Sequence, residues 1–253
     1  MKKNKTANRI LFTLAAIVFI SAVAYLAVFF YEQYAANREY NDLPTNPTDK
    51  YEPLAYNPID FDTLIKGNDE IYAWIKIDDT KVDYPIVQHS AEDDGFYLTH
   101  SAIDKSYLQS GAIYTEACNK KDFKDPVTLV YGHNNYGDSM FTTLHKFEDK
   151  DFFDKHEFVY IYTPTKKLTY KVISAFKYDD RHIMNTNDFS DQKNLSEFQQ
   201  MLLNPESDNK NVRENMEEIN ENSKIMILST CITGDKESRF LVCCLLVNDE
   251  RTD

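Results

Sequence analysis

Hydrophobic residues along this chain form one long uncharged run, followed by a series of short runs rich in β-formers. The long run, residues 10–30, contains no charged side chain. About 20 apolar residues in a helix span the hydrocarbon core of a bilayer, because each residue adds about 1.5 Å. A secretory signal has a shorter apolar core, of roughly 7–15 residues, and ends in small residues. We therefore expect a retained transmembrane helix over residues 10–30.

Polar segments flank this run on both sides. Residues 1–9 are basic and contain no acid, and such a flank stays in the cytoplasm. Residues 31–57 are polar and carry three prolines, which is typical of a stalk. We expect a cytoplasmic tail (1–9), a membrane anchor (10–30), an extracellular stalk (31–57) and an extracellular folded body (58–253).

Short runs of β-branched and aromatic residues separated by polar links predict strands throughout the folded body. The predicted strands are residues 71–77, 82–88, 111–115, 127–131, 158–163, 168–178, 224–230 and 240–247. Strands 158–163 and 168–178, with a turn at residues 164–166 between them, are predicted to form a hairpin. About eight strands in one domain favour a closed or nearly closed β-barrel.

Two stretches have helical periodicity instead, residues 60–66 and 190–203. Their apolar positions are Phe61, Leu64 and Ile65 in the first stretch and Leu195, Phe198 and Leu202 in the second. Ser190 or Asn194 can cap the start of the second helix. The predicted fold class is therefore mainly β, with a short N-terminal helix and a helix before the penultimate strand.

Composition fits one globular domain with an extension. The chain has 253 residues, of which 42% are hydrophobic and 27% charged, and glycine and proline are scarce. Its formal net charge is -13, and the part outside the basic first nine residues is more negative still. Because an acidic body repels phosphate backbones, we expect no nucleic-acid partner.

The four cysteines are Cys118, Cys231, Cys243 and Cys244. No CxxC pair or Cys/His ligand spacing occurs, so we expect no structural metal, and four cysteines are too few for a disulfide framework. Cys243 and Cys244 are neighbours in an apolar strand and point to opposite faces. We interpret both as packing residues.

The segment 224–247 is the part of the chain where chemistry is best indicated. Cys231 ends its first apolar run, Arg239 opens the second, and Gly234-Asp235 predicts a turn between them. Cross-strand neighbours on one face lie about 5 Å apart, so a thiol and a guanidinium can share a site. A nearby cation favours the reactive thiolate and can hold a developing oxyanion.

Six histidines are candidates for the base, and each alone is typical of a loop or surface residue. His133 differs because it directly follows the predicted strand 127–131, with Gly132 allowing the chain to turn. Catalytic groups commonly lie on loops at strand ends. A cysteine and a distant histidine that meet in the fold can carry out acyl transfer through a thioester.

Three motifs resemble those of a known family. LVYGHNN (129–135) and MFTTLHKF (140–147) are similar to the histidine region of sortases, and ILSTC (227–231) followed by Arg239 is similar to their Cys-and-Arg signature. The helix near 190–203 and the LSTC form are similar to class B sortases. The resemblance runs from about residue 60 to the C-terminus.

This resemblance implies an eight-stranded β-barrel and a cysteine transpeptidase without a cofactor. By position, Cys231 would be the nucleophile, His133 the acid/base, and Arg239 the residue that binds the substrate carbonyl or oxyanion. Ser229, two residues before the cysteine on the same strand face, would support substrate or arginine. The calcium dependence of some class A sortases is not implied.

The partners that the resemblance implies are secreted proteins and the Gram-positive cell wall. Such an enzyme cleaves a C-terminal sorting signal after threonine, holds the acyl group on Cys231 and passes it to a peptide amine of the wall. Ile232 departs from the acidic residue found there in some class B members, so contacts with the sorting signal can differ.

Two alternatives remain open at the level of sequence. A pilus-building sortase would use a lysine amine of a pilin as acceptor, and the barrel sequence separates this poorly from wall anchoring. A non-catalytic, membrane-anchored binding module would use the barrel surface alone. The non-catalytic module is disfavoured, because the chain has all three of Cys231, His133 and Arg239.

Overall fold

The computed structural model describes residues 3–41, 56–135, 137–214 and 219–252. The chain divides into two compact units, Met1–Asp42 and Leu43–Asp253. The first contains helix α1 (Lys3–Asn41). Within it, Thr13–Glu32 is long and apolar enough to cross a membrane, so α1 is a candidate transmembrane helix.

Helix α1 extends beyond the predicted span at both ends. It includes most of the basic segment 1–9 and the first part of the predicted stalk 31–57. Residues 1–2 of the predicted tail and residues 42–55 of the predicted stalk lie outside the described residues.

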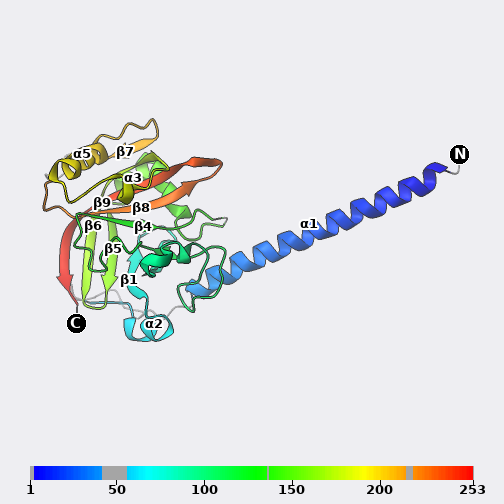
Figure 1. Cartoon of the computed structure of the whole chain (residues 1–253), viewed down its shortest axis with the longest axis horizontal. Coiled ribbons are helices and arrows are strands. Elements are labelled where there is room, and N and C mark those ends of the chain that lie inside the picture. Colours follow the sequence, from blue (N-terminus) through cyan, green and yellow to red (C-terminus); the bar gives the residue numbers. More distant parts are fainter. Residues whose placement is uncertain (1–2, 42–55, 136, 215–218, 253) are drawn as a thin grey trace. The chain divides into compact units, whose positions relative to one another are not determined.

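The second unit is a β-barrel (Figure 1). In its described part, nine strands form one sheet in the order β5-β1-β2-β3-β4-β8-β9-β6-β7, and β5 also pairs with β6. This pairing closes eight strands into a barrel and leaves β7 beside β6. The strands are β1 (Ile71–Lys76), β2 (Asp83–Val87), β3 (Ile113–Tyr114), β4 (Val127–Tyr131), β5 (Phe158–Thr163), β6 (Lys166–Asp179), β7 (Lys210–Val212), β8 (Ile225–Ile232) and β9 (Asp235–Arg251).

The eight predicted strands and the closed barrel are confirmed, and several ends differ. β9 is the largest difference, because it begins at Asp235 and ends at Arg251, whereas residues 240–247 were predicted. Of its polar ends, residues 248–251 and Ser238 pair with β6, and Asp235 pairs with Ile232 of β8. Hydrophobic pattern does not mark such ends. For the same reason the short polar strand β7 was not predicted.

Short helices connect the strands. They are α2 (Phe61–Gly67), α3 (Lys150–Lys155), α4 (Ile183–Thr186) and α5 (Gln192–Leu203), together with the 3-10 segments Ala91–Asp93, Phe96–Leu98 and Thr142–Glu148. In α2, Phe61 and Leu64 are buried, whereas Ile65 is 38% exposed.

Helix α5 begins at a different cap from those predicted. The Asp191 carboxylate accepts hydrogen bonds from the backbone N–H groups of Lys193 and Asn194, which makes Asp191 the N-cap. The hydroxyl of Ser190 instead donates to Asp188 at 2.6 Å. Asn194 lies inside the helix and supplies one of the capped N–H groups.

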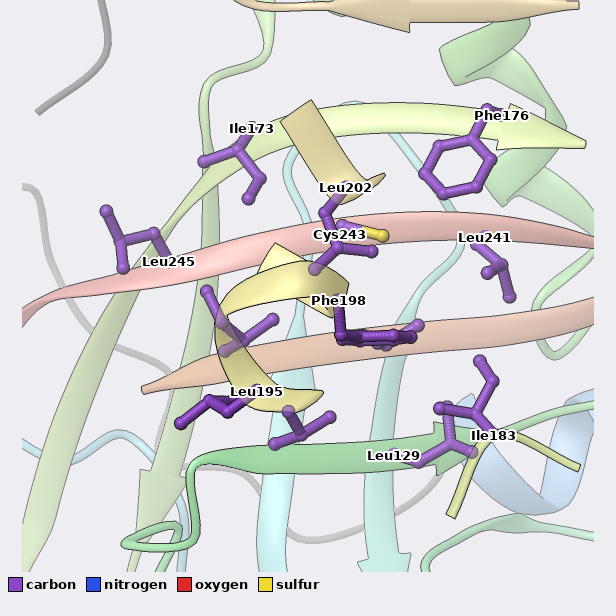
Figure 2. Packing of buried hydrophobic residues seen from close by; sticks show 13 residues of the cluster. Leu129, Ile173, Phe176, Ile183, Leu195, Phe198, Leu202, Leu241, Cys243 and Leu245 are labelled. Carbon is purple, nitrogen blue, oxygen red and sulfur yellow. The ribbon is translucent and has the colours of Figure 1, made fainter. Parts of the chain in front are cut away.

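The apolar face of α5 packs on the outside of the barrel. Leu195, Phe198 and Leu202 point from the helix toward side chains of β4, β8, β9 and β6 (Figure 2). An eight-stranded barrel has room inside only for its own side chains, so this cluster covers the outer face. The strand residues in it alternate along each strand, and include Val127 and Leu129, Ile225 and Ile227, and Leu241, Cys243 and Leu245.

Candidate functional site

The candidate residues lie where the same outer strand faces run beyond the α5 cluster. Strands β4 and β8 are parallel, with Tyr131 paired to Ser229, and the Gly132 N–H donates to the Ser229 carbonyl at 3.2 Å. His133 lies two residues after Tyr131, and Cys231 lies two residues after Ser229. The register of two distant segments thus brings the histidine and the cysteine to one end of the barrel.

The β8–β9 hairpin adds the arginine. Cys231 and Arg239 are Cα partners across the antiparallel ladder, as expected from the sequence. The turn is tighter than predicted, because Ile232 already pairs with Asp235. Its two connecting residues are Thr233 and Gly234, and Gly234 has a φ of +81°, which glycine adopts without strain.

His133 is half-buried and held by two contacts. Its ring Nε2 lies 2.7 Å from the Leu98 carbonyl oxygen, and its own carbonyl accepts from Phe141 N–H at 3.0 Å. Because a carbonyl oxygen only accepts, Nε2 carries the hydrogen. Nδ1 is then the ring nitrogen that can gain and lose a proton.

Glycine is needed at position 132 for a different reason from the one predicted. Its φ is not positive, so the chain does not need glycine here for a turn. A Cβ at this position would lie 2.5 Å from Cδ1 of Ile113 and 2.7 Å from the Phe141 ring. Glycine therefore permits the close approach that sets the position of His133.

The Arg239 guanidinium is oriented by its own strand. Nη1 donates to the carbonyl of Lys236 at 3.1 Å and to the carbonyl of Ser238 at 2.9 Å. In the part of the chain that the structure describes, Nε and Nη2 have no hydrogen-bond partner in the protein. Those donors are free to bind an oxygen of a ligand.

Ser229 is buried and lies on the same face of β8 as Cys231, whose side chain is exposed. A cavity of about 110 Å³ borders Ser229, Arg239, Tyr131 and His182. The serine and the arginine therefore line one small hollow.

A polar network next to this cavity was not predicted. Glu116 accepts a hydrogen bond from His182 Nε2 at 2.9 Å and from the Tyr131 hydroxyl at 3.4 Å. Burial, followed by the Glu116 carboxylate, raises the pKa of Tyr131, so its hydroxyl stays protonated. The sequence offered no signal for this network, since Glu116 and His182 are 66 residues apart.

The other three thiols are held in the neutral form. Partial desolvation of the sulfur, followed by the Glu116 and Asp94 carboxylates, raises the pKa of Cys118 to about 11 although the residue is exposed. Burial raises the pKa of Cys243 to about 12 and that of Cys244 well above its usual value. Cys243 and Cys244 are fully buried on opposite faces of β9, in agreement with the packing role predicted for both.

No group of three or more His, Cys, Asp or Glu residues suited to a metal ion occurs among residues that the structure describes.

Comparison with known proteins gives consistent matches. The family model described as Sortase domain matches residues 75–247. Sortase B of Listeria monocytogenes serovar 1/2a is 31% identical over 176 residues, covering 67% of this chain and 66% of that relative, or about two thirds of its length.

Two solved structures are similar over most of the barrel. Sortase B from Bacillus anthracis is 26% identical with a TM-score of 0.68, and the match covers 87% of this chain and 99% of that one. A Streptococcus pyogenes class B sortase described as involved in pilus biogenesis is 29% identical with a TM-score of 0.61, covering 75% and 98% of the two chains.

Proposed function

This chain belongs to the sortase family of transpeptidases and is similar to its class B members, and we propose that it joins secreted proteins to a cell-wall peptide amine. The observation that carries the proposal is the pairing of Cys231 with Arg239, beside the strand end that bears His133. The exposed thiol, the half-buried cation and the half-buried imidazole lie at one end of the barrel.

In the first half-reaction, the Cys231 thiolate attacks the threonine carbonyl carbon of a C-terminal sorting signal. A C–S bond forms, and the carbonyl electron pair moves to oxygen, where the Arg239 guanidinium stabilises the charge. Collapse breaks the C–N bond. The departing amine takes a proton from His133, and a thioester remains on Cys231.

In the second half-reaction, an amine of the wall peptide attacks the thioester. His133 accepts the proton of the amine, a new C–N bond forms, and the Cys231 thiolate leaves. Ser229 borders the same cavity as Arg239, so we assign it to support of the arginine or of the bound signal.

The membrane arrangement belongs to the same proposal. We propose a cytoplasmic tail (1–9), an anchor (10–30), a stalk (31–57) and an extracellular catalytic barrel (58–253). Support comes from the apolar stretch Thr13–Glu32 and from the basic residues before it. This orientation puts the thiol where secreted chains and wall precursors meet.

The test is a peptide-library cleavage assay with the full chain in detergent micelles. Cys231→Ala should abolish thioester formation and cleavage while the circular dichroism spectrum stays unchanged. His133→Ala should lower turnover by about 10²–10⁴-fold and Arg239→Ala by about 10²–10³-fold. Full cleavage by the Cys231→Ala enzyme would end the proposal.

A second acceptor is favoured by one observation, the similarity to the Streptococcus pyogenes class B sortase described as involved in pilus biogenesis. For this chain the corresponding acceptor would be a lysine amine of a pilin subunit. Offering the acyl-enzyme a wall-type peptide amine and a pilin side by side would separate the two, because the true acceptor would be consumed first.

A further inference from the structure

The Cys231 carbonyl lies at a point where the regular ladders around β8 end. The Ser229 carbonyl, two residues earlier on the same edge of the strand, accepts from Gly132 N–H. β4 ends at Tyr131, so no further strand backbone follows it there. On the other edge, the β8–β9 register shifts between Cys231 and Ile232. On the β4 edge, therefore, something other than strand pairing must hold the carbonyl of this cysteine.

Two side chains converge on that carbonyl oxygen. Asn134 Nδ2 donates to it at 2.9 Å and also contacts the Thr233 hydroxyl at 3.1 Å. His145 Nε2 lies 3.0 Å from the same oxygen and 3.1 Å from Asn134 Nδ2, so the imidazole contacts both partners of the Asn134–Cys231 hydrogen bond. The two side chains come from the chain that follows β4, about ninety residues before the cysteine.

The imidazole of His145 is itself fixed on its other side. Its Nδ1 is hydrogen-bonded to the Glu148 carboxylate. The ring also stacks on Phe240 of β9, with centroids 5.0 Å apart and an angle of 25° between the planes. Phe240 is fully buried, so the ring rests on the rigid barrel core. These contacts limit how far the imidazole can move.

We propose that Asn134, His145 and Glu148 form a carbonyl clamp that positions Cys231 for acylation. The clamp acts through the main chain and touches no reacting atom. It takes the place of the ladder on the edge where β4 has ended, so that the thiol keeps its position relative to His133 and Arg239. A displacement of about 1 Å in a reacting group can cost on the order of 10²-fold in rate. This inference rests on the proposed function, since it names what aligns the proposed nucleophile.

Two substitutions at His145 separate the hydrogen bond from the packing. His145→Phe keeps a ring against Phe240 but has no nitrogen to bond Asn134 or the Cys231 carbonyl, whereas His145→Gln keeps a polar group at the position of Nε2 and loses the ring. Asn134→Ala removes the amide that donates to the carbonyl without altering the core. Each variant is prepared as the full chain and compared with the unsubstituted protein by two measurements.

The first measurement is amide hydrogen exchange of the segment 229–235, which needs no substrate. Exchange there should become faster in His145→Phe and Asn134→Ala and stay close to the unsubstituted protein in His145→Gln. The second is the single-turnover acylation rate with a peptide that the unsubstituted protein cleaves. That rate should fall about 10-fold or more in His145→Phe, with peptide binding unchanged, and by a smaller factor in His145→Gln.

The reverse order, with His145→Phe normal and His145→Gln impaired in both measurements, would show that the ring only packs and would overturn the clamp. Unchanged exchange and acylation in both His145→Phe and Asn134→Ala would overturn it as well. If His145→Phe does not fold, Asn134→Ala decides. A protein that exchanges as expected but acylates no peptide in any form would refute the proposed function and leave the clamp supported.

Discussion

Gly132→Ala tests whether close packing before His133 positions the histidine. The new Cβ would lie 2.5 Å from Ile113 Cδ1 and 2.7 Å from two carbons of the Phe141 ring. Carbon atoms in ordinary contact are about 3.5–4.0 Å apart, so the backbone or its neighbours must shift by about 1 Å. Ile113 and Phe141 are both fully buried and cannot move into solvent. Overpacking of this kind costs about 1–3 kcal/mol of unfolding free energy.

The larger effect should fall on catalysis. If the backbone yields instead of the core, the residue displaced next is His133. A shift of about 1 Å at a catalytic group lowers the rate on the order of 10²-fold. We therefore expect Gly132→Ala to lose more activity than its loss of stability explains, because a few kcal/mol would still leave most molecules folded.

Urea denaturation and single-turnover acylation measure the two effects on the same samples. Gly67→Ala is the matched control, because the nearest atom to its new Cβ is at an ordinary 3.5 Å. It should change neither quantity appreciably. Ile113→Val removes the methyl group that the new Cβ would strike, so the double variant should recover part of the lost stability. Wild-type stability and acylation in Gly132→Ala would refute the reasoning.

Two further predictions concern the thiols and the outer helix. At pH 7–8 a thiol reagent should modify Cys231 before Cys118, although both are exposed, because a pKa of about 11 leaves Cys118 almost wholly protonated. Labelling of Cys118 should rise as the pH approaches that value. Mass spectrometry showing Cys118 labelled first at neutral pH would contradict this prediction. Leu202→Ala should lower the unfolding free energy by about 2–5 kcal/mol, since this fully buried side chain joins α5 to the barrel. Gln200→Ala on the exposed side of the same helix should change it by less than about 0.5 kcal/mol in the same urea titration, and equal losses in the two variants would contradict the packing of α5.

Short runs of β-branched and aromatic residues between polar links were enough to predict the eight barrel strands, and helical spacing was enough for α5. Both signals are local, because each depends only on residues that are close together in the sequence. The pairing of Cys231 with Arg239 was equally accessible, since two strands joined by a short turn have few registers available. The N-cap of α5 could not be predicted in this way, because the Ser190 hydroxyl donates to Asp188 and Asp191 caps the helix instead.

The contacts that complete the site depend on residues far apart in the chain. His133 comes near Cys231 only because β4 and β8 pair in parallel with Tyr131 opposite Ser229. His145 has the sequence context of an ordinary loop histidine, and its contact with the Cys231 carbonyl follows from that pairing and from Phe240 beneath the ring. The sequence by itself determined the elements and the residue types of the site, because both are recorded in local patterns. Only the closed barrel decided which strand ends meet, because register between distant strands is set by packing of the whole core.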